Sequence, residues 1–373
     1  MNRIDFGGPE KVYSGYITFH KDTMAATIKD VARLASVSIG TVSRVLNERA
    51  NVDAQLRERV EAAIRELHYR PNARARVFVQ NSTPVISFIL SNRSLLNPFH
   101  SGILQGAEEY CESEGFFVMF TKYDYSPLTK PSELRLPGVL QSHGIADCLI
   151  LAGTNYENFV EAVERLGVPY VILANHHVTG KPVAPYDRVG WDDDQGPYEA
   201  TRYLITLGHR HIWYIGDTSL PWYQQRYRSY ERAMRESGLE PLGQTVGLSN
   251  NYYANGYACT QVILDKGYPV TAIFAAYDEI AFGAADALQK HGLSIPQDVS
   301  LIGYGDDDGA QFKVPPLTSV HVDKARVGRE LARMAVEKLR RPGRRMAALT
   351  VPVRLMKRGT TRTANALAET AQG

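Results

Sequence analysis

Two short helices separated by a three-residue turn are the feature that most constrains this chain. Apolar residues recur at helical spacing in two runs: Ile28, Val31 and Ala35, then Val42, Val45 and Leu46. The turn between them is Ser36-Val37-Ser38, and Ser38 can cap the second helix by accepting backbone N–H bonds. Such a pair forms a helix-turn-helix unit, whose second helix fits the major groove of DNA. The spacing alone also fits an ordinary helical hairpin in a larger core.

A third helix is predicted to follow and to cover this pair. Asp53 is its expected N-cap, and its apolar residues fall on one face: Leu56, Val60, Ala63, Ile64 and Leu67. Pro71 ends this helix, and residues 71–83 form a short connector. Residues 27–80 carry ten Lys or Arg and six Asp or Glu, although the whole chain has a net charge of only +2. This basic excess lies where a phosphate backbone would contact the chain.

After residue 84, apolar runs of strand length alternate with helical stretches. The first expected strands are Val85–Leu90, Phe117–Thr121, Cys148–Leu151 and Tyr170–Ala174, and the second series is Ile212–Ile215, Thr245–Leu248, Ala272–Ala276 and Val299–Gly303. The expected helices are Phe99–Glu114, Asn158–Leu166, Gln195–Leu207, Tyr253–Lys266, Glu279–His291 and Asp323–Arg341, and a last strand is expected at Leu349–Leu355. The alternation indicates parallel sheets covered on both faces. Two series indicate two lobes, with a small-molecule cleft at the carboxyl ends of the strands.

The composition narrows the class of protein. With 373 residues, 44% hydrophobic and 22% charged, the chain is predicted to form two or three globular domains. Three cysteines, Cys111, Cys148 and Cys259, are widely spaced in apolar runs and are expected to be reduced, buried thiols. No apolar run approaches the length of a membrane span, and the N-terminus has no hydrophobic signal core. We therefore expect a cytoplasmic protein, and a secreted solute-binding protein is disfavoured.

The stretch TIKDVARLASVSIGTVSRVLN, continued by NVDAQLRERVEAAIRELHYRPNARA, resembles the DNA-binding headpiece of the LacI/GalR family of bacterial transcription regulators. The match runs without a gap from Thr27 to about Phe78, and a looser resemblance to the family's sugar-binding core extends to about Thr361. The implied fold is α/β, with a three-helix headpiece and a two-lobed, Rossmann-like effector domain similar to periplasmic binding proteins. The implied limits are 25–70 for the headpiece, 71–83 for a hinge helix, 84–363 for effector binding and dimerisation, and 364–373 for a tail. Residues 1–24 are expected to be a disordered extension, or translation starts at Met24.

The resemblance assigns DNA contacts residue by residue. Ile39 and Gly40 match the two positions that read operator bases; Ile39 can touch a thymine methyl, while Gly40 offers no side chain. Arg44 is the expected base reader, because its guanidinium can bond bidentately to guanine, and a phosphate-only contact is the alternative. Lys29 is expected at a base edge or a phosphate. The positions expected to hold backbone phosphates are Ser38, Thr41, Ser43, Asn47, Asn51, Tyr69 and Asn72.

Two headpiece positions depart from the family pattern. Phe78 stands where the family inserts a leucine into the central base step of the operator from a hinge helix that forms on DNA. An aromatic wedge can also unstack a base step and bend DNA, so we expect Phe78 to keep this role, with packing on the lobe surface as the alternative. Ser36 replaces the usual turn glycine, at a cost of about 1 kcal/mol if the residue is left-handed.

The resemblance also places effector-binding residues in the cleft. Arg226, in QQRYRSY, matches the arginine that grips ligand hydroxyls or carboxylates, with a salt bridge as the alternative. Trp222 can stack on an apolar sugar face, and Tyr223 beside it can do the same. The other candidates are Asn97 and Phe99, which resemble the family's NPFF stretch, and Asn175 at a strand end.

Two substitutions in the cleft weaken any analogy to a particular sugar. The family often has Asn-Asp where this chain has Tyr277-Asp278, and Asp-Asp where it has Gly305-Asp306. One amide and one carboxylate that usually bond ligand hydroxyls are therefore absent, and Tyr277 adds an aromatic ring. Tyr277 and Asp306 are retained as effector candidates, although Asp278 and Asp306 can instead anchor helices or loops.

The resemblance implies a homodimeric repressor of sugar-uptake or catabolism genes, bound to a near-palindromic DNA operator and controlled by a sugar-type effector. A nucleobase effector is an alternative within the family. An NAD-binding enzyme is the alternative from another class, because Gly303–Gly309 is a near miss to the dinucleotide fingerprint. No cofactor is expected, and capping is favoured over metal binding for His209 and His211.

Overall fold

The structure is a computed structural model and describes residues 27–46, 52–67, 85–94, 97–142, 145–181, 183–245 and 251–364. The chain divides into two compact units with their boundary between Asn81 and Ser82, and each is described by itself. Several predictions lie outside the described residues: the extension over 1–24, the connector over 71–83, the tail after 364, and the DNA contacts of Asn47, Asn51, Tyr69, Asn72 and Phe78.

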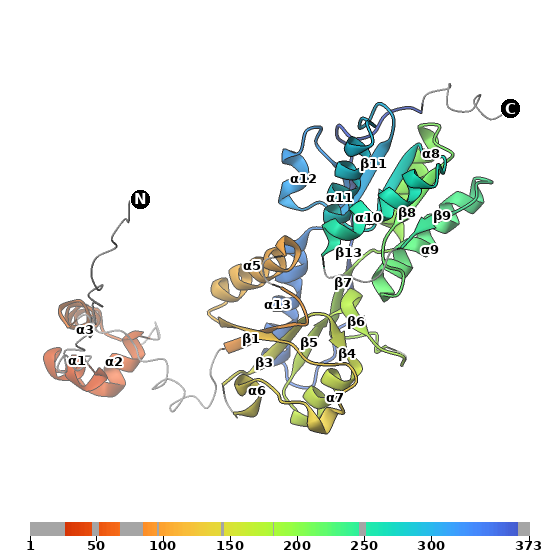
Figure 1. The fold of residues 1–373 in the computed structure, drawn as a ribbon. Helices are drawn as coiled ribbons and strands as arrows, with labels where there is room; N and C mark the ends of the chain where they lie inside the picture. Colours follow the sequence, from red (N-terminus) through yellow and green to blue (C-terminus); the bar gives the residue numbers. More distant parts are fainter. Residues whose placement is uncertain are drawn as a thin grey trace, which may run out of the picture. The chain divides into compact units, whose positions relative to one another are not determined.

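The first unit contains three helices around a small apolar core (Figure 1). They are α1 (Ile28–Leu34), α2 (Ile39–Leu46) and α3 (Ala54–Glu66). The core is formed by buried residues of all three helices and of the turn after α1: Val31, Ala32, Ala35, Val42, Val45, Val60 and Ala63. The predicted helix-turn-helix and its covering third helix are thus confirmed.

Side-chain caps set where these helices begin. The Ser38 Oγ accepts the backbone N–H of Thr41 at 3.1 Å, which confirms the expected cap of α2. The Asp53 carboxylate accepts the backbone N–H groups of Gln55 at 2.9 Å and Leu56 at 3.3 Å, so the expected cap of α3 is also confirmed. Each cap supplies an acceptor for helix N–H groups that have no partner within the helix.

The turn between α1 and α2 is strained and is held by α3. Ser36 adopts φ +52°, the left-handed conformation that costs about 1 kcal/mol or more for a residue with a Cβ. The Arg59 guanidinium of α3 donates to the carbonyl oxygens of Ala35 at 2.5 Å and Ser36 at 3.4 Å. Arg59 therefore stabilises the turn in the conformation that sets α2 against α1.

The second unit has two lobes, of which lobe 1 is built on a six-stranded sheet in the order β13-β7-β5-β3-β1-β2 (Figure 1). Its strands are β1 (Val85–Ser91), β2 (Phe117–Tyr123), β3 (Cys148–Gly153), β5 (Tyr170–Leu173), β7 (Arg188–Trp191) and β13 (Leu349–Val351), and all are parallel. Helices α5 (Pro98–Ser113) and α13 (Lys324–Arg340) pack with Phe88 on one face, and α7 (Glu157–Leu166) packs with Ile89 on the other. The sheet is therefore covered on both faces, as predicted.

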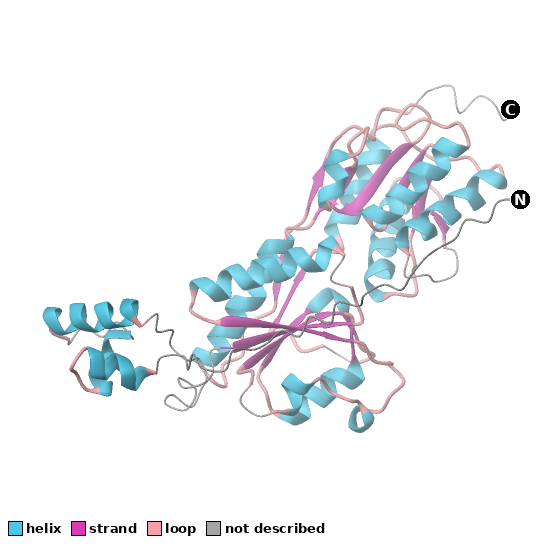
Figure 2. Ribbon diagram, turned by 60° about the vertical axis from the view of Figure 1, so that its left-hand side comes forward, coloured by secondary structure: helices cyan, strands magenta, loops and turns pink. Residues whose placement is uncertain are grey.

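Lobe 2 is built on a second sheet in the order β14-β12-β11-β10-β8-β9. Its strands are β8 (Ile212–Ile215), β9 (Leu242–Gln244), β10 (Ala272–Ala275), β11 (Ser300–Gly305), β12 (Thr318–His321) and β14 (Arg354–Met356), of which only β14 is antiparallel. Its main helices are α8 (Gln195–Thr206), α9 (Pro221–Glu236), α10 (Tyr252–Asp265) and α11 (Asp278–Lys290). Helices lie on both faces of this sheet as well (Figure 2).

The shorter elements are η1 (Pro131–Glu133), α6 (Gly138–Gln141), β4 (Asn155–Tyr156), η2 (Ala174–His176), β6 (His177–Val178) and α12 (Asp308–Phe312). Strands β4 and β6 pair with each other in a separate two-stranded sheet. None of the described helices combines the length and the apolar character needed to cross a membrane.

Two strand predictions are wrong in detail. The stretch Leu349–Leu355 forms two strands, because β13 pairs with β7 in lobe 1 and β14 pairs with β12 in lobe 2. Pro352 lies between them and has no N–H to donate to a ladder, and the chain passes from lobe 1 to lobe 2 at this point. The strand expected at Thr245–Leu248 is β9, which already ends at Gln244; residues 246–250 lie outside the described part of the chain.

Helices far apart in the sequence approach closely through glycine. Helix α13 packs along α5, as Figure 1 shows. A Cβ added to Gly328 of α13 would lie 1.9 Å from the Ile103 carbonyl oxygen, and one added to Gly106 of α5 would lie 2.0 Å from the Ala325 carbonyl oxygen. The backbones of α5 and α13 are therefore in close contact at Gly106 and Gly328, where an added Cβ would clash.

Candidate functional site

Helix α2 exposes one face and buries the other. Ser38, Ile39, Gly40 and Arg44 are exposed, with Ile39 at 45% of its full exposure, while Thr41 and Ser43 are half-buried. Val42 and Val45 are buried against α1 and α3. Lys29 on α1 is exposed as well. The described DNA-contact candidates on α2 thus lie on or beside a face that is free of the headpiece core, as a helix inserted in a groove requires.

Ser38 and Thr41 are among the residues of this set that have partners within the headpiece. The Ser38 and Thr41 hydroxyls lie 3.0 Å apart and form a hydrogen bond, so part of their bonding capacity is used within α2. Gly40 has room for a side chain, since an added Cβ would meet only the Ser38 Oγ at 3.6 Å. The bare position 40 is therefore not demanded by packing within the described headpiece.

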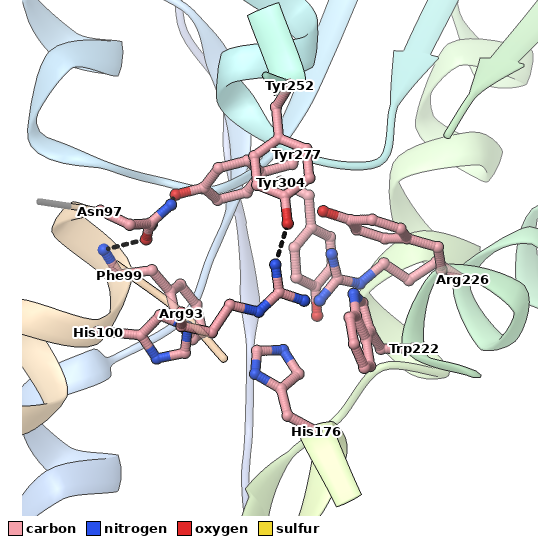
Figure 3. Close-up of a pocket in the computed structure, with 11 residues that line it drawn as sticks. Arg93, Asn97, Phe99, His100, His176, Trp222, Arg226, Tyr252, Tyr277 and Tyr304 are labelled. Carbon is pink, nitrogen blue, oxygen red and sulfur yellow. Dashed lines mark hydrogen bonds between the residues drawn. The ribbon is translucent and has the colours of Figure 1, made fainter. Parts of the chain in front are cut away.

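A cavity lies between the two lobes of the second unit (Figure 3). It holds about 390 Å³ of space, its opening to solvent included. Lobe 1 supplies Arg93, Asn97, Phe99, His100 and His176, and lobe 2 supplies Trp222, Tyr223, Arg226, Tyr252, Tyr277 and Tyr304. The cavity is thus rich in aromatic rings and contains two guanidinium groups.

Six of the predicted effector residues line this cavity: Asn97, Phe99, Trp222, Tyr223, Arg226 and Tyr277. Asn97 caps α5 by accepting the Phe99 backbone N–H at 3.0 Å, so both residues lie at the N-terminus of this helix. The Tyr277 hydroxyl lies 3.3 Å from the Asn97 Oδ1 across the two lobes. The fold thus brings together two of the predicted residues that lie 180 positions apart in the sequence.

The structure places Asn175 and Asp306 outside the lining. The Asn175 amide brackets β7, since it accepts the Trp191 N–H at 2.9 Å and donates to the Asp193 carboxylate at 2.7 Å. Asp306 bonds to His321 at 2.9 Å and to Arg358 at 2.6 Å. Burial opposes ionisation of Asp306, but these two bonds outweigh it and lower its pKa to about 2. Both side chains are occupied by contacts within the protein.

Arg226 is held in the interior by Asp193. Its Nε donates to the Asp193 carboxylate at 2.8 Å and its guanidinium donates to the Ala276 carbonyl oxygen at 2.7 Å, with both charged side chains more than nine-tenths buried. The Tyr304 ring lies against the guanidinium, 3.7 Å from its centroid. The salt bridge that was the alternative for Arg226 is present, and Arg226 lines the cavity as well.

Asp193 is a junction between the lobes that the sequence did not indicate. The same carboxylate accepts from the Trp191 indole at 3.0 Å and from the Tyr304 hydroxyl at 2.6 Å. Asp193 lies on the segment that runs from β7 in lobe 1 to α8 in lobe 2. One buried carboxylate therefore bonds residues of both lobes at the point where the chain passes between them.

Arg93 was also missed, although it follows β1 by only two residues. Its Nε donates to the Thr154 hydroxyl at 2.8 Å and its Nη1 donates to the Tyr252 hydroxyl of lobe 2. The guanidinium lies 5.1 Å from the Trp222 ring centroid. The available signal in the sequence was an arginine just after β1, at the end of the strand that faces the cleft. The direction of its side chain, however, depends on the tertiary fold.

Two buried histidines complete the lobe 1 wall. The His100 and His176 rings lie edge to face, 5.5 Å between centroids, and the Nδ1 of each is buried without a hydrogen-bond partner among the described residues. Burial first, and then the Arg93 charge, lower the pKa of His100 to about 3. Burial first, and then the neighbouring His100, Arg93 and Arg226, lower the pKa of His176 well below its usual range. Both imidazoles are therefore neutral at pH 7.

The remaining titratable candidates have structural roles. Asp278 accepts from Ser319 at 2.6 Å and from the Asp307 backbone N–H at 2.7 Å, so it anchors the loop after β11. Burial and the neighbouring Asp307 raise the pKa of Asp278 to about 7. His209 bonds to Ser300 at 2.9 Å. Among the described residues no cluster of His, Cys, Asp and Glu suits a metal ion, and the three cysteines are buried and form no disulfide.

Known proteins share both units of this architecture. The description "Bacterial regulatory proteins, lacI family" matches residues 27–72, and "Periplasmic binding protein-like domain" matches residues 201–361. The repressor PurR of Haemophilus influenzae is 31% identical over 84% of this chain and 91% of its own length. The regulator CelR of Thermobifida fusca is 33% identical over 88% of this chain and 95% of its own length.

Solved structures agree with these sequence matches. A lac repressor dimer bound to operator and an anti-inducer superposes with a TM-score of 0.76 and 26% identity, covering 91% of this chain and all of that chain. A CelR–cellobiose complex gives a TM-score of 0.65 and 29% identity, covering 90% of this chain and 99% of that chain. The similar proteins are named as transcriptional regulators, and the predicted two-lobed fold is confirmed.

Proposed function

Because this chain belongs to the LacI family of bacterial transcription regulators, we propose that it is a homodimeric repressor whose operator affinity depends on a sugar-type effector. The effector binds in the cavity between the lobes, and the headpiece reads a near-palindromic site through two copies of α2. We keep the limits 25–70, 71–83 and 84–363 for the headpiece, the hinge and the effector domain as part of this proposal.

The observation that carries DNA recognition is the exposed face of α2. Arg44 projects from a helix that Val42 and Val45 fix to the core, so its guanidinium can meet a base edge without reorganising the headpiece. Ile39 on the same exposed face can contact a thymine methyl. Because Gly40 leaves a gap between these residues, we expect the operator to be read mainly at the positions facing Ile39 and Arg44.

The test replaces Arg44 and measures binding to an operator selected from random DNA by the full-length protein. A bidentate arginine–guanine contact is worth about 1–3 kcal/mol, so Arg44→Ala should weaken operator binding about 5- to 150-fold while binding to scrambled DNA changes little. The matched control is Arg65→Ala, which removes the same charge from an exposed position in the last turn of α3. Equal losses in both variants, or equal losses on operator and scrambled DNA, would contradict base reading by Arg44.

The sugar-type effector is supported by the cavity and by relatives. Aromatic rings such as Trp222 and Tyr277 can stack on the apolar face of a pyranose, and polar groups such as Asn97 can bond its hydroxyls. Solved relatives hold cellobiose or ribose. A nucleobase is the second candidate, because the same rings can stack on a flat heterocycle. A thermal-shift screen against saccharides and purines separates the two, and a purine hit without any sugar hit would overturn the sugar proposal.

A further inference from the structure

We infer that the effector carries a carboxylate and that Arg93 binds it, so the ligand is a sugar acid of the uronate type. This inference rests on the proposed function of the same cavity. It starts from the charges on the cavity wall. The described lining contains the guanidinium groups of Arg93 and Arg226 and no carboxylate.

The two guanidinium groups differ in their partners. Arg226 is neutralised by the buried Asp193 carboxylate at 2.8 Å. Arg93 bonds only to the neutral hydroxyls of Thr154 and Tyr252 and forms no ion pair with any described residue. Among the described residues that line it, the cavity therefore has one positive charge without an opposing charge. A partly desolvated cation of this kind attracts a ligand oxyanion far more strongly than an exposed one does.

No other described residue of the lining supplies or removes a charge at neutral pH. His100 and His176 are neutral because burial lowers the pKa of each. Their buried Nδ1 atoms can still exchange hydrogen bonds with ligand hydroxyls. One uncompensated positive charge matches a carboxylate, which carries one negative charge, better than a phosphate, which carries nearly two at pH 7.

The position of Arg93 suits this role. Figure 3 shows its side chain reaching into the cavity from lobe 1 toward Tyr252 of lobe 2. Tyr252 also packs edge to face on Tyr277, with ring centroids 5.5 Å apart. A carboxylate on Arg93 would thus lie beside aromatic faces that can hold the sugar ring. Binding would join lobe 1 to lobe 2 through the ligand as well as through the Tyr252 hydroxyl.

The experiment is calorimetric titration of the full-length protein with glucuronate and galacturonate, with glucose and galactose as neutral counterparts, and with glucose 6-phosphate as the phosphate counterpart. A hydrogen bond to a charged partner is worth about 1.5–3 kcal/mol, which corresponds to roughly 10- to 150-fold in affinity. At least one uronate should therefore bind about 10-fold or more tightly than its neutral counterpart. Arg93→Gln should abolish this preference, so that the uronate and its neutral counterpart bind with similar affinity.

The matched control is Arg165→Gln, which removes one positive charge from an exposed position of α7 in lobe 1. It should retain the uronate preference. Equal binding of uronate and neutral sugar, tighter binding of glucose 6-phosphate, or no binding of either uronate would each overturn the inference. Gel shifts on the selected operator keep the two proposals apart. An operator complex that responds to a neutral sugar supports the proposed function and contradicts this inference. If the unaltered protein does not bind the operator specifically, the proposed function itself is refuted.

Discussion

Replacing Asp193 with asparagine removes the negative charge that Arg226 contacts in the interior of the second unit. The carboxylate accepts from Arg226 at 2.8 Å, from Trp191 at 3.0 Å and from Tyr304 at 2.6 Å through one oxygen, and from Asn175 at 2.7 Å through the other. An asparagine has the same shape but only one acceptor oxygen. If that oxygen keeps the three donors, its amide nitrogen faces the Asn175 amide nitrogen, and two donors meet.

The expected cost follows from burial. Both members of the pair are more than nine-tenths buried, with 3% of Arg226 and 6% of Asp193 side-chain surface exposed. Removing one partner of a buried ion pair costs about 3–5 kcal/mol, because the other charge is left in a poorly solvated site. Asp193→Asn and Arg226→Met should each lower the free energy of unfolding by about this amount. The double variant should lose clearly less than the sum, because neither charge remains.

Urea unfolding followed by circular dichroism at pH 7.5 gives the three free energies. The control is Glu231→Gln, which breaks the Arg235–Glu231 pair on the exposed surface of α9 and should cost less than about 1 kcal/mol. A loss below 1 kcal/mol for Asp193→Asn would show that the charge of Arg226 is solvated in some other way. Additive losses in the double variant would show that the two side chains act independently, and either result would refute the reasoning.

Two further predictions test packing and protonation. Gly328→Ala should lower the free energy of unfolding by about 1–3 kcal/mol or more, because its Cβ would lie 1.9 Å from the Ile103 carbonyl oxygen; Gly138→Ala, with open space around it, should change it by less than about 0.5 kcal/mol. The pKa of His100 is lowered to about 3, so below pH 6.5 the unfolded chain takes up a proton that the folded chain does not. Stability should therefore decrease as the pH is lowered, and His100 should contribute about 2 kcal/mol of the loss between pH 7.5 and 5.0. Urea unfolding at both pH values should show a loss that is smaller by that amount in His100→Leu. The control is His291→Gln, which removes an exposed histidine whose pKa is raised and should not reduce the loss. An unchanged pH dependence in His100→Leu would contradict the burial argument.

Local patterns in the sequence predicted the three headpiece helices and most helices and strands of the second unit, but they missed strands such as β7 and β12. Helical periodicity located α1, α2 and α3, and the residue types at Ser38 and Asp53 predicted their caps, because a cap depends on atoms two or three residues away. Alternation of apolar runs with helical stretches predicted two parallel sheets. Periodicity failed at Leu349–Leu355, where an apolar run that looks continuous is divided between two sheets.

The cavity was predictable only where a family motif marked it. Resemblance pointed to Asn97 and Arg226, but Arg93 and the two histidines carry no motif, and Asn175 proved to bracket β7. Arg93 meets Thr154 and Tyr252, which are 61 and 159 positions away. Which residues become partners over such distances depends on the tertiary arrangement of the two lobes. The sequence thus determined the elements and the family, through short-range periodicity and capping, while burial and long-range pairing in the tertiary structure decided which charges in the cleft are neutralised and which one is left for a ligand.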